Sequence, residues 1–436
     1  MTRLVWFEHD LRIEDNLALY EASRAGEPIL CVYCQDPTIF APHNFGFRHT
    51  GVHRRRFIDE SLVDLDVRLA RRGQALWVAE GRGIDVLPKL IRELNIQHIY
   101  KSWHPGVYEQ KVWRQLQVLA PGAQWHLCEG NTLFSRELIE SQCHDFANGS
   151  FSRFRKKVSG LSPSKTAPSL MRLPPPPTNH QLARPAPLPS ASTARFSGGE
   201  NAALTHLVKY FASELPNTYL DTRNALMGEG TSSTFSPWLA NGCLSVRAVA
   251  EALQRFESEH GKTLSTGWLY QELLWREFFY WYSALYKNKL FKFEGKSTHR
   301  PKTSHYSQRL KAWCEGTTPW PLVNACMREL NATGFLSNRG RQIVASCLVN
   351  ELAHDWRYGA AYFEQQLVDY DMGANWGNWQ YIAGVGADSR GGRHFNLAKQ
   401  KQQFDADNQY TNTWLKNQDA PVYSGLDYVD AADWPL

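Results

Sequence analysis

Short apolar runs alternate with amphipathic stretches along the first part of the chain. Five runs have the length and the aromatic and β-branched content of buried strands: 4–8, 28–34, 75–80, 98–103 and 123–129. The stretches between them place apolar residues at helical spacing, as in HRRRFIDESLVDLDVRLARR at 53–72. Alternating strands and helices build a parallel sheet with helices on both faces. The pattern therefore predicts a doubly wound parallel α/β domain over residues 1–130.

The pattern changes twice after this domain. Residues 131–198 include LSPSKTAPSLMRLPPPPTNHQLARPAPLPSAS at 161–192, whose proline and serine content prevents a continuous helix or sheet. From residue 199 onward apolar positions recur at helical spacing, as in SVRAVAEALQRFESEH at 245–260. We therefore expect a long Pro-rich linker over 131–198 and an all-α second domain over 199–436.

Composition and charge exclude several classes of protein. The net charge of +5 on 436 residues permits a polyanionic partner without demanding one. The longest apolar runs are too short to span a bilayer, and charges directly follow the first apolar residues, so we expect no membrane span and no signal peptide. Cys31 and Cys34 form a C-x-x-C inside a strand-like run without a second pair or a nearby histidine, which favours buried thiols over a metal site. Eight scattered cysteines indicate a reducing cytoplasm.

Residues 367–386, LVDYDMGANWGNWQYIAGVG, combine carboxylates, amides and tryptophans in a way that suits neither a plain core helix nor a plain loop. Two other stretches also carry polar and aromatic groups on one helical face. These are Glu272, Trp275 and Arg276 in the first, and Asn338, Arg341 and Gln342 in the second. Each has an ordinary alternative, since a Glu–Arg pair can lie at the surface and Asn338 can cap a helix. Together, the three stretches predict a pocket lined by these side chains.

A hydroxyl-rich loop, TSSTFS at 231–236, precedes a predicted helix. Hydroxyl groups, loop amides and a helix N-terminus can together bind phosphate, although an ordinary capping loop has the same composition. No G-x-G-x-x-G follows the first strand, so a Rossmann-type dinucleotide site is not expected in the α/β domain. Sixteen tryptophans and eighteen tyrosines are consistent either with a large core or with stacking on planar ligands.

Several long motifs, in order and with regular spacing, resemble the photolyase/cryptochrome family. They are TSSTFSPWLANGCLS, ELLWREFF, MRELNATGFLSNRGRQIVASCL and DWRYGAAYFEQQLVDYDMGANWGNWQY. The variants SNRGRQ and NWGNWQY, with FSRFRKK at 151–157, look like the cryptochrome-DASH branch. The resemblance covers the chain apart from the Pro-rich linker and the end after Trp414. It implies a photolyase-type antenna domain followed by a helical FAD-binding domain.

The resemblance implies one non-covalent FAD in the helical domain. By position, the residues that correspond to FAD-binding positions of the family are Tyr219, Ser232, Ser233, Ser236, Arg276, Asn338, Arg341, Asp369, Asp371 and Asn375. Arg341 and Asp369 correspond to an ion pair beside the isoalloxazine, and a buried Asp requires such a partner. Asn375 corresponds to the residue that faces flavin N5, where a neutral amide bonds the reduced ring without adding negative charge.

The same resemblance implies electron donors, a substrate cavity and an antenna. Trp379 and Trp356 correspond to the proximal and middle members of a tryptophan chain, whereas Thr303 stands at the distal position and Tyr306 is nearby. The expected substrate-cavity residues are Glu272, Trp275, Gln342 and Tyr381, with Phe335 a weaker assignment; Arg390, Arg393 and Lys399 are possible phosphate contacts. Glu109, with Tyr108 beside it, corresponds to the carboxylate that binds a 5,10-methenyltetrahydrofolate antenna.

Three functions follow as hypotheses. The first is a light-driven lyase, carried by Glu272, Trp275, Asn375, Trp356 and Trp379, that repairs cyclobutane pyrimidine dimers in single-stranded or looped DNA. The second is a blue-light photoreceptor that signals to a protein partner, for which the short acidic end of the chain is thin evidence. The third is a flavin-bearing nucleic-acid binder without turnover. We expect a cytoplasmic monomer.

Overall fold

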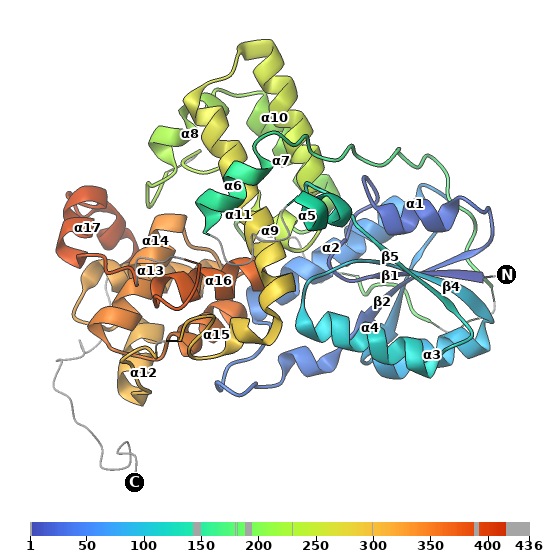
Figure 1. Ribbon diagram of the computed structural model, residues 1–436, viewed down its shortest axis with the longest axis horizontal. Coiled ribbons are helices and arrows are strands. Elements are labelled where there is room, and N and C mark those ends of the chain that lie inside the picture. The colour runs from blue at the N-terminus through green and yellow to red at the C-terminus, as the bar shows by residue number, and fades with distance from the viewer. Residues whose placement is uncertain are drawn as a thin grey trace, which may run out of the picture.

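The computed structural model describes residues 2–142, 150–178, 180, 182–187, 194–228, 230–298, 300–387 and 392–415. Its N-terminal part is a five-stranded parallel sheet with the order β3-β2-β1-β4-β5 (Figure 1). The strands are β1 (Thr2–Phe7), β2 (Ile29–Gln35), β3 (Leu76–Glu80), β4 (Ile96–Ser102) and β5 (Gln124–Cys128). This sheet, followed by a helical region, confirms the predicted fold class.

Helices cover both faces of the sheet because alternate side chains of each strand point in opposite directions. Leu4 and Trp6 of β1 pack with α3 (Gly83–Glu93) and α4 (Val107–Leu119) in one apolar cluster. Val5 and Phe7 pack on the opposite face, whose helices are α1 (Leu17–Ser23) and α2 (Val52–Ala70). The second cluster continues into the helical region, so the two parts share one core.

The segment between the two parts contains two short helices and then an extended stretch. The helices are α5 (Arg136–Gln142) and α6 (Phe151–Val158). The extended stretch lies against the edge of the sheet, where the backbone N–H of Val78 in β3 donates to the carbonyl of Ala183 at 2.8 Å. Covering an edge strand in this way satisfies backbone groups that would otherwise be open to other chains.

From Glu200 onward the described chain is helical (Figure 1). Its helices are α7 (Glu200–Phe211), α8 (Leu215–Thr222), α9 (Ser236–Ala240), α10 (Val246–His260), α11 (Leu264–Tyr286), α12 (Ser307–Glu315), α13 (Pro321–Thr333), α14 (Asn338–Ser346), α15 (Trp356–Gln366), α16 (Met372–Ile382), α17 (Leu397–Phe404) and α18 (Gln409–Leu415). The turns η3 (Lys287–Phe291) and η4 (Cys347–Glu351) complete them, and a further turn, η1 (Pro37–Phe40), belongs to the N-terminal part. In the described part of the chain, no helix is both long enough and apolar enough to span a bilayer.

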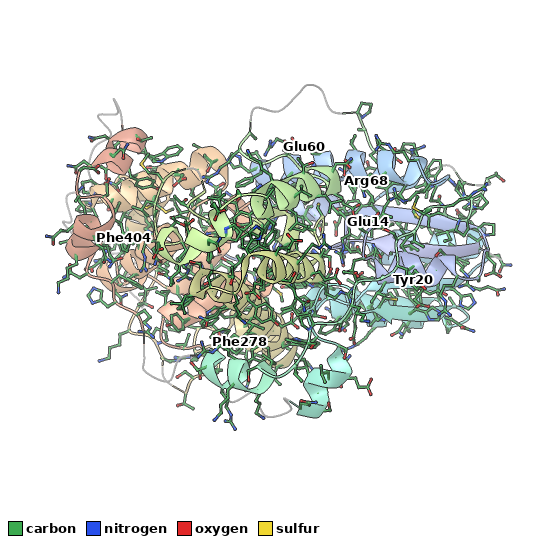
Figure 2. The ribbon with its side chains drawn as sticks, turned by 90° about the horizontal axis from the view of Figure 1, so that it is seen from above. Glu14, Tyr20, Glu60, Arg68, Phe278 and Phe404 are labelled. Atoms are coloured by element: carbon green, nitrogen blue, oxygen red, sulfur yellow. The ribbon has the colours of Figure 1, made fainter. Side chains whose placement is uncertain are left out.

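Buried polar contacts join the sheet to the helical part. Asp15 forms an ion pair with Arg247 of α10, with 2.7 Å between Oδ1 and Nη2, and both side chains are nearly inaccessible to solvent. Glu200 at the start of α7 accepts hydrogen bonds from the backbone N–H groups of Ile13 and Glu14, each at 2.8 Å. Figure 2 shows Glu14 and Arg68 between the two parts, and Arg68 also pairs with Glu200 at 2.7 Å. These contacts hold the helical site in a fixed orientation to the sheet.

Candidate functional site

A cavity of about 410 Å³ opens within the helical part, in the size range of small-molecule sites. It is bounded by α8, the loop at 231–236, α11, α14 and α16. The predicted site residues that line it are Tyr219, Ser232, Ser233, Ser236, Glu272, Trp275, Arg276, Asn338, Arg341, Gln342, Asp369, Asp371, Asn375, Trp379 and Tyr381; Phe335 lines it as well. Trp356 and Glu109 lie elsewhere. Residues from five separate segments therefore meet at one hollow.

An ion pair forms one wall of the cavity. Arg341 Nη2 lies 2.8 Å from Asp369 Oδ2 and 3.0 Å from Oδ1, and Ser236 Oγ donates to Oδ2 at 2.6 Å. Arg341 Nε is fixed by a 2.8 Å bond to the carbonyl of Leu336. The Asp369 side chain is almost fully buried, so its charge depends on these donors.

Asn375 also lines the cavity. Its amide nitrogen donates to the carbonyl of Ala360 at 2.9 Å, which fixes the orientation of the group. Asp371 is the N-cap of α16 and accepts from the backbone N–H of Ala374 at 2.8 Å. Gly377 lets this helix approach α11, since a Cβ there would lie 2.4 Å from the Phe279 ring. The helix thus brings Asn375 to the cavity wall.

The hydroxyl loop is held in place from behind. Thr234 has a φ of 49°, an uncommon left-handed conformation for a non-glycine residue. His206 Nε2 lies 2.8 Å from the carbonyl of Ser233 and 3.1 Å from Thr234 Oγ1, and it supports this turn. Ser232 and Ser233 remain half-buried at the cavity edge, just before helix α9 begins at Ser236.

Two other predicted pocket residues have local partners. Arg276 donates from Nη1 to the carbonyl of Asn131 at 2.8 Å, which ties α11 to the chain after the sheet. Asn338 begins α14, but its neighbour Ser337 supplies the N-cap by accepting from Gly340 N at 3.1 Å. The capping alternative for Asn338 is therefore wrong, and its side chain lines the cavity instead.

Two residues that were not expected from the sequence contact the predicted substrate residues Glu272 and Trp275. Arg223 forms an ion pair with Glu272, and Phe151 of α6 stacks on the Trp275 indole with ring centroids 3.6 Å apart and an interplanar angle of 10°. Burial raises the pKa of Glu272 above its ordinary value, against the opposing effect of Arg223. A sequence signal existed for both additions, because Arg223 lies one turn after Tyr219 and Phe151 opens the FSRFRKK motif.

Other predicted positive charges are less closely tied to the cavity. The Arg393 guanidinium lies over the Tyr381 ring at 5.1 Å, whereas Lys399 is exposed on α17. Arg390 lies outside the described residues.

The two predicted donor tryptophans, Trp379 and Trp356, each contact a different further tryptophan. Trp379 lines the cavity and has Trp313 at 6.1 Å and Phe363 at 5.2 Å between ring centroids. Its far edge packs on Gly359, where a Cβ would lie 2.2 Å from Trp379 Cη2. Trp356, one turn before Gly359 on α15, is fully buried and contacts Trp376 at 5.9 Å. Trp376 belongs to the same sequence motif, but the resemblance assigns it no role.

Thr303 stands where the resemblance places the distal member of the donor chain. Tyr306, three residues further on, is the N-cap position of α12 and has the Arg309 guanidinium 4.1 Å from its ring centroid.

Glu109 belongs to a separate cluster at the carboxyl ends of β1 and β4, where the order of the strands reverses. Its Oε1 lies 3.2 Å from His9 Nε2 and 3.5 Å from His104 Nδ1. Burial alone would raise the pKa of Glu109, but the two histidines hold it below its ordinary range. Burial lowers the pKa of His104 to about 3. Tyr280 of α11 donates to the carbonyl of Trp103 at 2.7 Å, so the cluster borders the helical part.

The three side chains could supply metal ligands, since their ligand atoms lie within 4.8 Å of one another. Two features work against convergence on one ion. The rings of His9 and His104 stack at 4.2 Å with an interplanar angle of 24°, so their in-plane lone pairs run side by side. His104 Nδ1 already accepts from the N–H of Gly106 at 3.1 Å. The cluster is better suited to hydrogen bonding than to metal binding.

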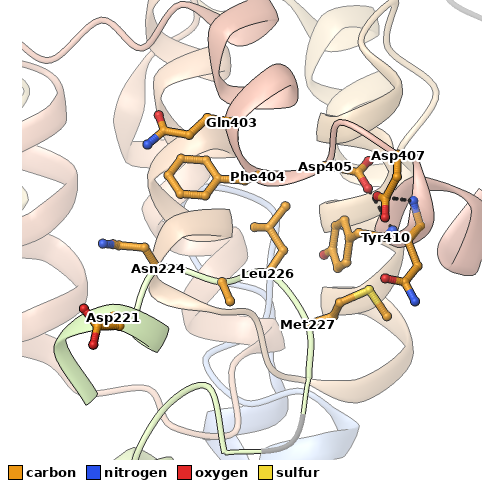
Figure 3. A pocket seen from close by; sticks show the side chains of 11 residues that line it. Asp221, Asn224, Leu226, Met227, Gln403, Phe404, Asp405, Asp407 and Tyr410 are labelled. Atoms are coloured by element: carbon orange, nitrogen blue, oxygen red, sulfur yellow. Dashed lines mark hydrogen bonds between the residues drawn. The ribbon is translucent and has the colours of Figure 1, made fainter. Parts of the chain in front are cut away.

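A smaller pocket of about 320 Å³ lies between the end of α8 and the turn from α17 to α18 (Figure 3). Asp405 in this pocket accepts from the backbone N–H of Tyr410 at 2.8 Å. Phe404 packs under the Arg339 guanidinium at 4.8 Å, and Arg339 bonds Asn224 at 3.0 Å. Its polar groups therefore serve to join these segments, and none of the predicted site residues lies there.

Two protein-family models match the chain. The model described as DNA photolyase matches residues 3–176, and the model described as the FAD binding domain of DNA photolyase matches residues 268–421. Together with the fold and the cavity, they define a flavoprotein of the blue-light photolyase type that binds FAD in its helical part.

Similarity to individual proteins shows to which branch of this class the chain belongs. Cryptochrome DASH of Idiomarina loihiensis is 48% identical over 99% of this chain and 95% of its own length, and that of Vibrio parahaemolyticus is 43% identical over 99% and 97%. The crystal structure of a Synechocystis cryptochrome has a TM-score of 0.90 at 39% identity, covering 95% of this chain and 88% of that one. A class III photolyase from Agrobacterium tumefaciens has a TM-score of 0.79 at 26% identity, with 95% and 86% covered. The chain therefore belongs to the photolyase/cryptochrome family, in its cryptochrome DASH branch.

Proposed function

We propose that the protein uses one FAD, bound in the helical cavity, for light-driven repair of cyclobutane pyrimidine dimers in single-stranded or looped DNA. The observation that carries the proposal is that the predicted flavin residues and the predicted substrate residues line the same cavity. Electron transfer is fast only over short distances, and one shared cavity would hold the flavin and the flipped dimer close together.

The donor and acceptor groups of the cavity fit a flavin dinucleotide. Ser232, Ser233 and Ser236 would hold the diphosphate and ribityl chain, with Tyr219 beside them. The Arg341–Asp369 pair offers a guanidinium whose charge is already balanced, so it can lie against a flat ring at low cost. The buried Nε of Arg223 has no hydrogen-bond partner among the described residues, which leaves a donor for a ligand.

Asn375 is suited to the edge of a flavin whose N5 gains a proton on reduction. One N–H of its amide donates to the carbonyl of Ala360, and its amide oxygen can accept from an N–H group. Being neutral, the amide adds no charge beside an anionic ring, and it has no acidic proton to give. Arg276 of α11, Asn338 at the start of α14 and Asp371 at the N-cap of α16 complete the proposed FAD set.

The chemistry that a bound flavin supplies is light-driven transfer of one electron to the dimer, with return of the electron after the ring has opened. The chain's own groups bind and orient the dimer. Trp275 lines the cavity, and its indole, which stacks on Phe151, would provide a stacking surface for a flipped base. Glu272 can accept from base N–H groups, while Gln342 and Tyr381 border the same opening. Trp379 and Trp356 are proposed to return reducing equivalents to the flavin.

The preference for single strands follows from the cost of base flipping. A dimer in a duplex must be unstacked and unpaired before it enters the cavity, and this cost is smallest in a single strand or a loop. The chain contributes large aromatic surfaces at the opening to recover the stacking energy.

The remaining parts of the proposal concern the antenna, the cellular compartment and the oligomeric state. We propose that Glu109 binds the pterin of a 5,10-methenyltetrahydrofolate, since the Glu109 cluster borders the helical part and keeps a charged carboxylate. Tyr108 is exposed beside it and lies 6.5 Å from Phe291 between ring centroids. A cytoplasmic monomer remains our expectation, and seven free thiols among the described residues suit a reducing compartment.

The test is dimer loss in oligonucleotides, measured with chemically reduced protein under blue light and in darkness. Single-stranded and duplex substrates are compared, and Glu272→Ala is the control variant, with bound FAD measured for both proteins. The proposal predicts light-dependent repair, faster on the single strand and lost in Glu272→Ala at unchanged FAD content. Survival of the dimer in both substrates, with flavin bound and reduced, would contradict it and favour photoreception through a protein partner.

A further inference from the structure

Trp376 belongs to a hydrogen-bonded cluster on the side of α16 away from the substrate opening. Its indole Nε1 donates to Glu364 Oε2 at 3.1 Å and lies 3.2 Å from the Tyr370 hydroxyl. Tyr370 donates to the same carboxylate oxygen at 2.9 Å, and His49 Nδ1 lies 2.7 Å from the other oxygen. Trp376 and Glu364 are both buried, at 3% and 7% exposure, whereas the His49 side chain is 41% exposed. The cluster thus connects a buried indole to solvent.

Trp376 is also in contact with the proposed electron-donor chain. Its ring lies 5.9 Å from that of Trp356 in an edge-to-face arrangement. The indole N–H groups of the two residues differ in their acceptors. Trp356 Nε1 donates to the neutral carbonyl of Phe293 at 3.0 Å, whereas Trp376 Nε1 faces a carboxylate. An indole that has lost an electron becomes a strong acid, and of these two acceptors only the carboxylate can take its proton.

We infer that Trp376 is the residue where the electron vacancy of the tryptophan chain comes to rest, with Glu364 as the acceptor of its indole proton. One electron passes from Trp376 to oxidised Trp356, which becomes neutral. The N–H bond of Trp376 breaks, and an O–H bond forms on Glu364. The products are a neutral tryptophanyl radical and a protonated carboxyl group, so charge and electrons balance. The inference rests on the proposed function, in which photoexcited flavin is the primary oxidant.

The surroundings of the cluster prepare Glu364 for this role. Burial alone would raise the pKa of Glu364, but the hydrogen bond from His49 and the charge of Arg54 hold it below its ordinary value. The carboxylate is therefore ionised before the electron moves. His49 lies between Glu364 and solvent and gives the proton a route outward.

The other aromatic rings near Trp376 are less able to retain the electron vacancy. Phe291 and Phe45 lie at 4.9 Å and 6.2 Å, and a phenyl ring is much harder to oxidise than an indole. Tyr370 carries the Arg54 guanidinium 4.5 Å above its ring, and this positive charge opposes removal of an electron from it. Tyr370 therefore serves as a hydrogen-bond partner of Glu364, and the vacancy stays on Trp376.

Trp313 offers a matched control. It also touches the chain, at 6.1 Å from Trp379, and it is fully buried. Its Nε1 donates to the carbonyl of Val344 at 2.9 Å, which cannot accept a proton. The inference predicts that an oxidised Trp313 is quickly reduced again, either by a neighbouring residue or by return of the electron from the flavin. Trp376, which can lose its proton, stays oxidised for longer.

The experiment generates radicals by flash photolysis and identifies them by transient absorption and electron paramagnetic resonance. Each protein is flashed twice: once with its bound flavin as oxidant, and once with a photo-oxidised ruthenium tris(bipyridine) complex in solution. The variants are Trp376→Phe, Glu364→Gln and Trp313→Phe, with bound FAD and circular dichroism recorded for each. Because the ruthenium complex supplies the oxidant independently, failure to bind or use FAD is distinguished from failure of this inference.

We expect a long-lived neutral tryptophanyl radical in the wild type and in Trp313→Phe, and its loss in Trp376→Phe. Glu364→Gln is expected to give the radical cation, which has a distinct visible spectrum, with a shorter lifetime. Deuterated water is expected to slow formation of the neutral radical in the wild type. An unchanged neutral radical in Trp376→Phe or in Glu364→Gln, or its absence from the wild type, would overturn the inference.

Discussion

At the scale of single residues, the carboxylate of Asp369 shows how the cavity depends on charge balance. It accepts two contacts from Arg341, at 2.8 and 3.0 Å, and one from Ser236 at 2.6 Å. Replacing Asp369 by Asn keeps the shape of the side chain but leaves the guanidinium without its counter-charge. We expect a loss of about 1–3 kcal/mol in the free energy of unfolding, because one partner of a largely buried pair is removed. Urea titration of the two proteins measures it.

The control for this prediction is an exposed ion pair. Asp85 and Arg82 are 2.6 Å apart, and both side chains are more than half exposed. Asp85→Asn is expected to leave the urea midpoint unchanged. Equal midpoints for Asp369→Asn and the wild type would show that the ion pair does not support the cavity wall.

The raised pKa of Glu272 predicts that dimer binding depends on pH. Burial raises its pKa above the ordinary 4.5, so the carboxylate is protonated at a higher pH than an exposed glutamate. Protonation removes its charge from the pair with Arg223 and removes an acceptor for base N–H groups. Affinity for a dimer-containing strand should therefore fall as the pH is lowered towards this raised pKa. Fluorescence anisotropy measures it, and in Glu272→Gln the affinity should be weaker and independent of pH over the same range.

At the scale of secondary-structure elements, the contact between α15 and α16 depends on one glycine. A Cβ on Gly359 would lie 2.2 Å from Trp379 Cη2 and 2.5 Å from Leu348 Cδ2. Gly359→Ala should lower the free energy of unfolding by about 1–3 kcal/mol through overpacking, despite the better helix propensity of alanine. It should also displace Trp379 and slow photoreduction of the flavin.

Gly267 in α11 provides the matched control, since no atom lies within 4 Å of the place that a Cβ would occupy there. Gly267→Ala should raise the free energy of unfolding by up to about 1 kcal/mol, because only helix propensity changes. If both alanine variants shift stability in the same direction, steric contact with Trp379 is not what determines the residue at 359.

The elements themselves were largely predictable from the sequence. The strands at 4–8 and 28–34 and the helix at 245–260 were predicted because their apolar residues recur at the spacing of a strand or a helix. Helix α6 was not predicted, because Phe151 and Phe154 pack on Trp275 and Phe278 of α11, a contact between distant segments that no local pattern indicates. The π-helical turn at Cys347–Glu351 likewise has no signal of its own in the sequence.

The site was predictable only as a set of residues. Motif resemblance indicated that Asp369 and Arg341 pair, and the structure adds Ser236 from a segment 133 positions away. Arg223 and Glu272 are 49 positions apart, and no periodicity relates them. Contacts between distant segments depend on how helices pack, and that information is not present in any local pattern.

At the scale of the whole molecule, the buried pair between Asp15 and Arg247 joins the sheet to the helical part. The two side chains are only 3% and 4% exposed, and Ser245 also contacts the carboxylate. Asp15→Asn leaves the buried Arg247 without its counter-charge, so we expect the free energy of unfolding to fall by about 3–5 kcal/mol. Calorimetry should show a lower melting temperature than that of the wild type. Two separated transitions in the variant would indicate that the sheet and the helical part unfold independently once this pair is removed.

Asp59 serves as the control, because its pair with Arg55 on α2 is about one-third exposed. Asp59→Asn should melt at the wild-type temperature. A decrease equal to that of Asp15→Asn would mean that loss of any negative charge on this basic chain lowers stability.

The action spectrum of dimer repair tests the central claim that flavin and dimer share one cavity. Chemically reduced protein is given a single-stranded oligonucleotide with one thymine dimer, and the efficiency of repair is measured across the near-ultraviolet and blue range. We predict that repair follows the absorption of the bound reduced flavin, with an additional band if folate occupies the site at Glu109. Repair that is absent at every wavelength, although the flavin is bound and reduced, would contradict the account.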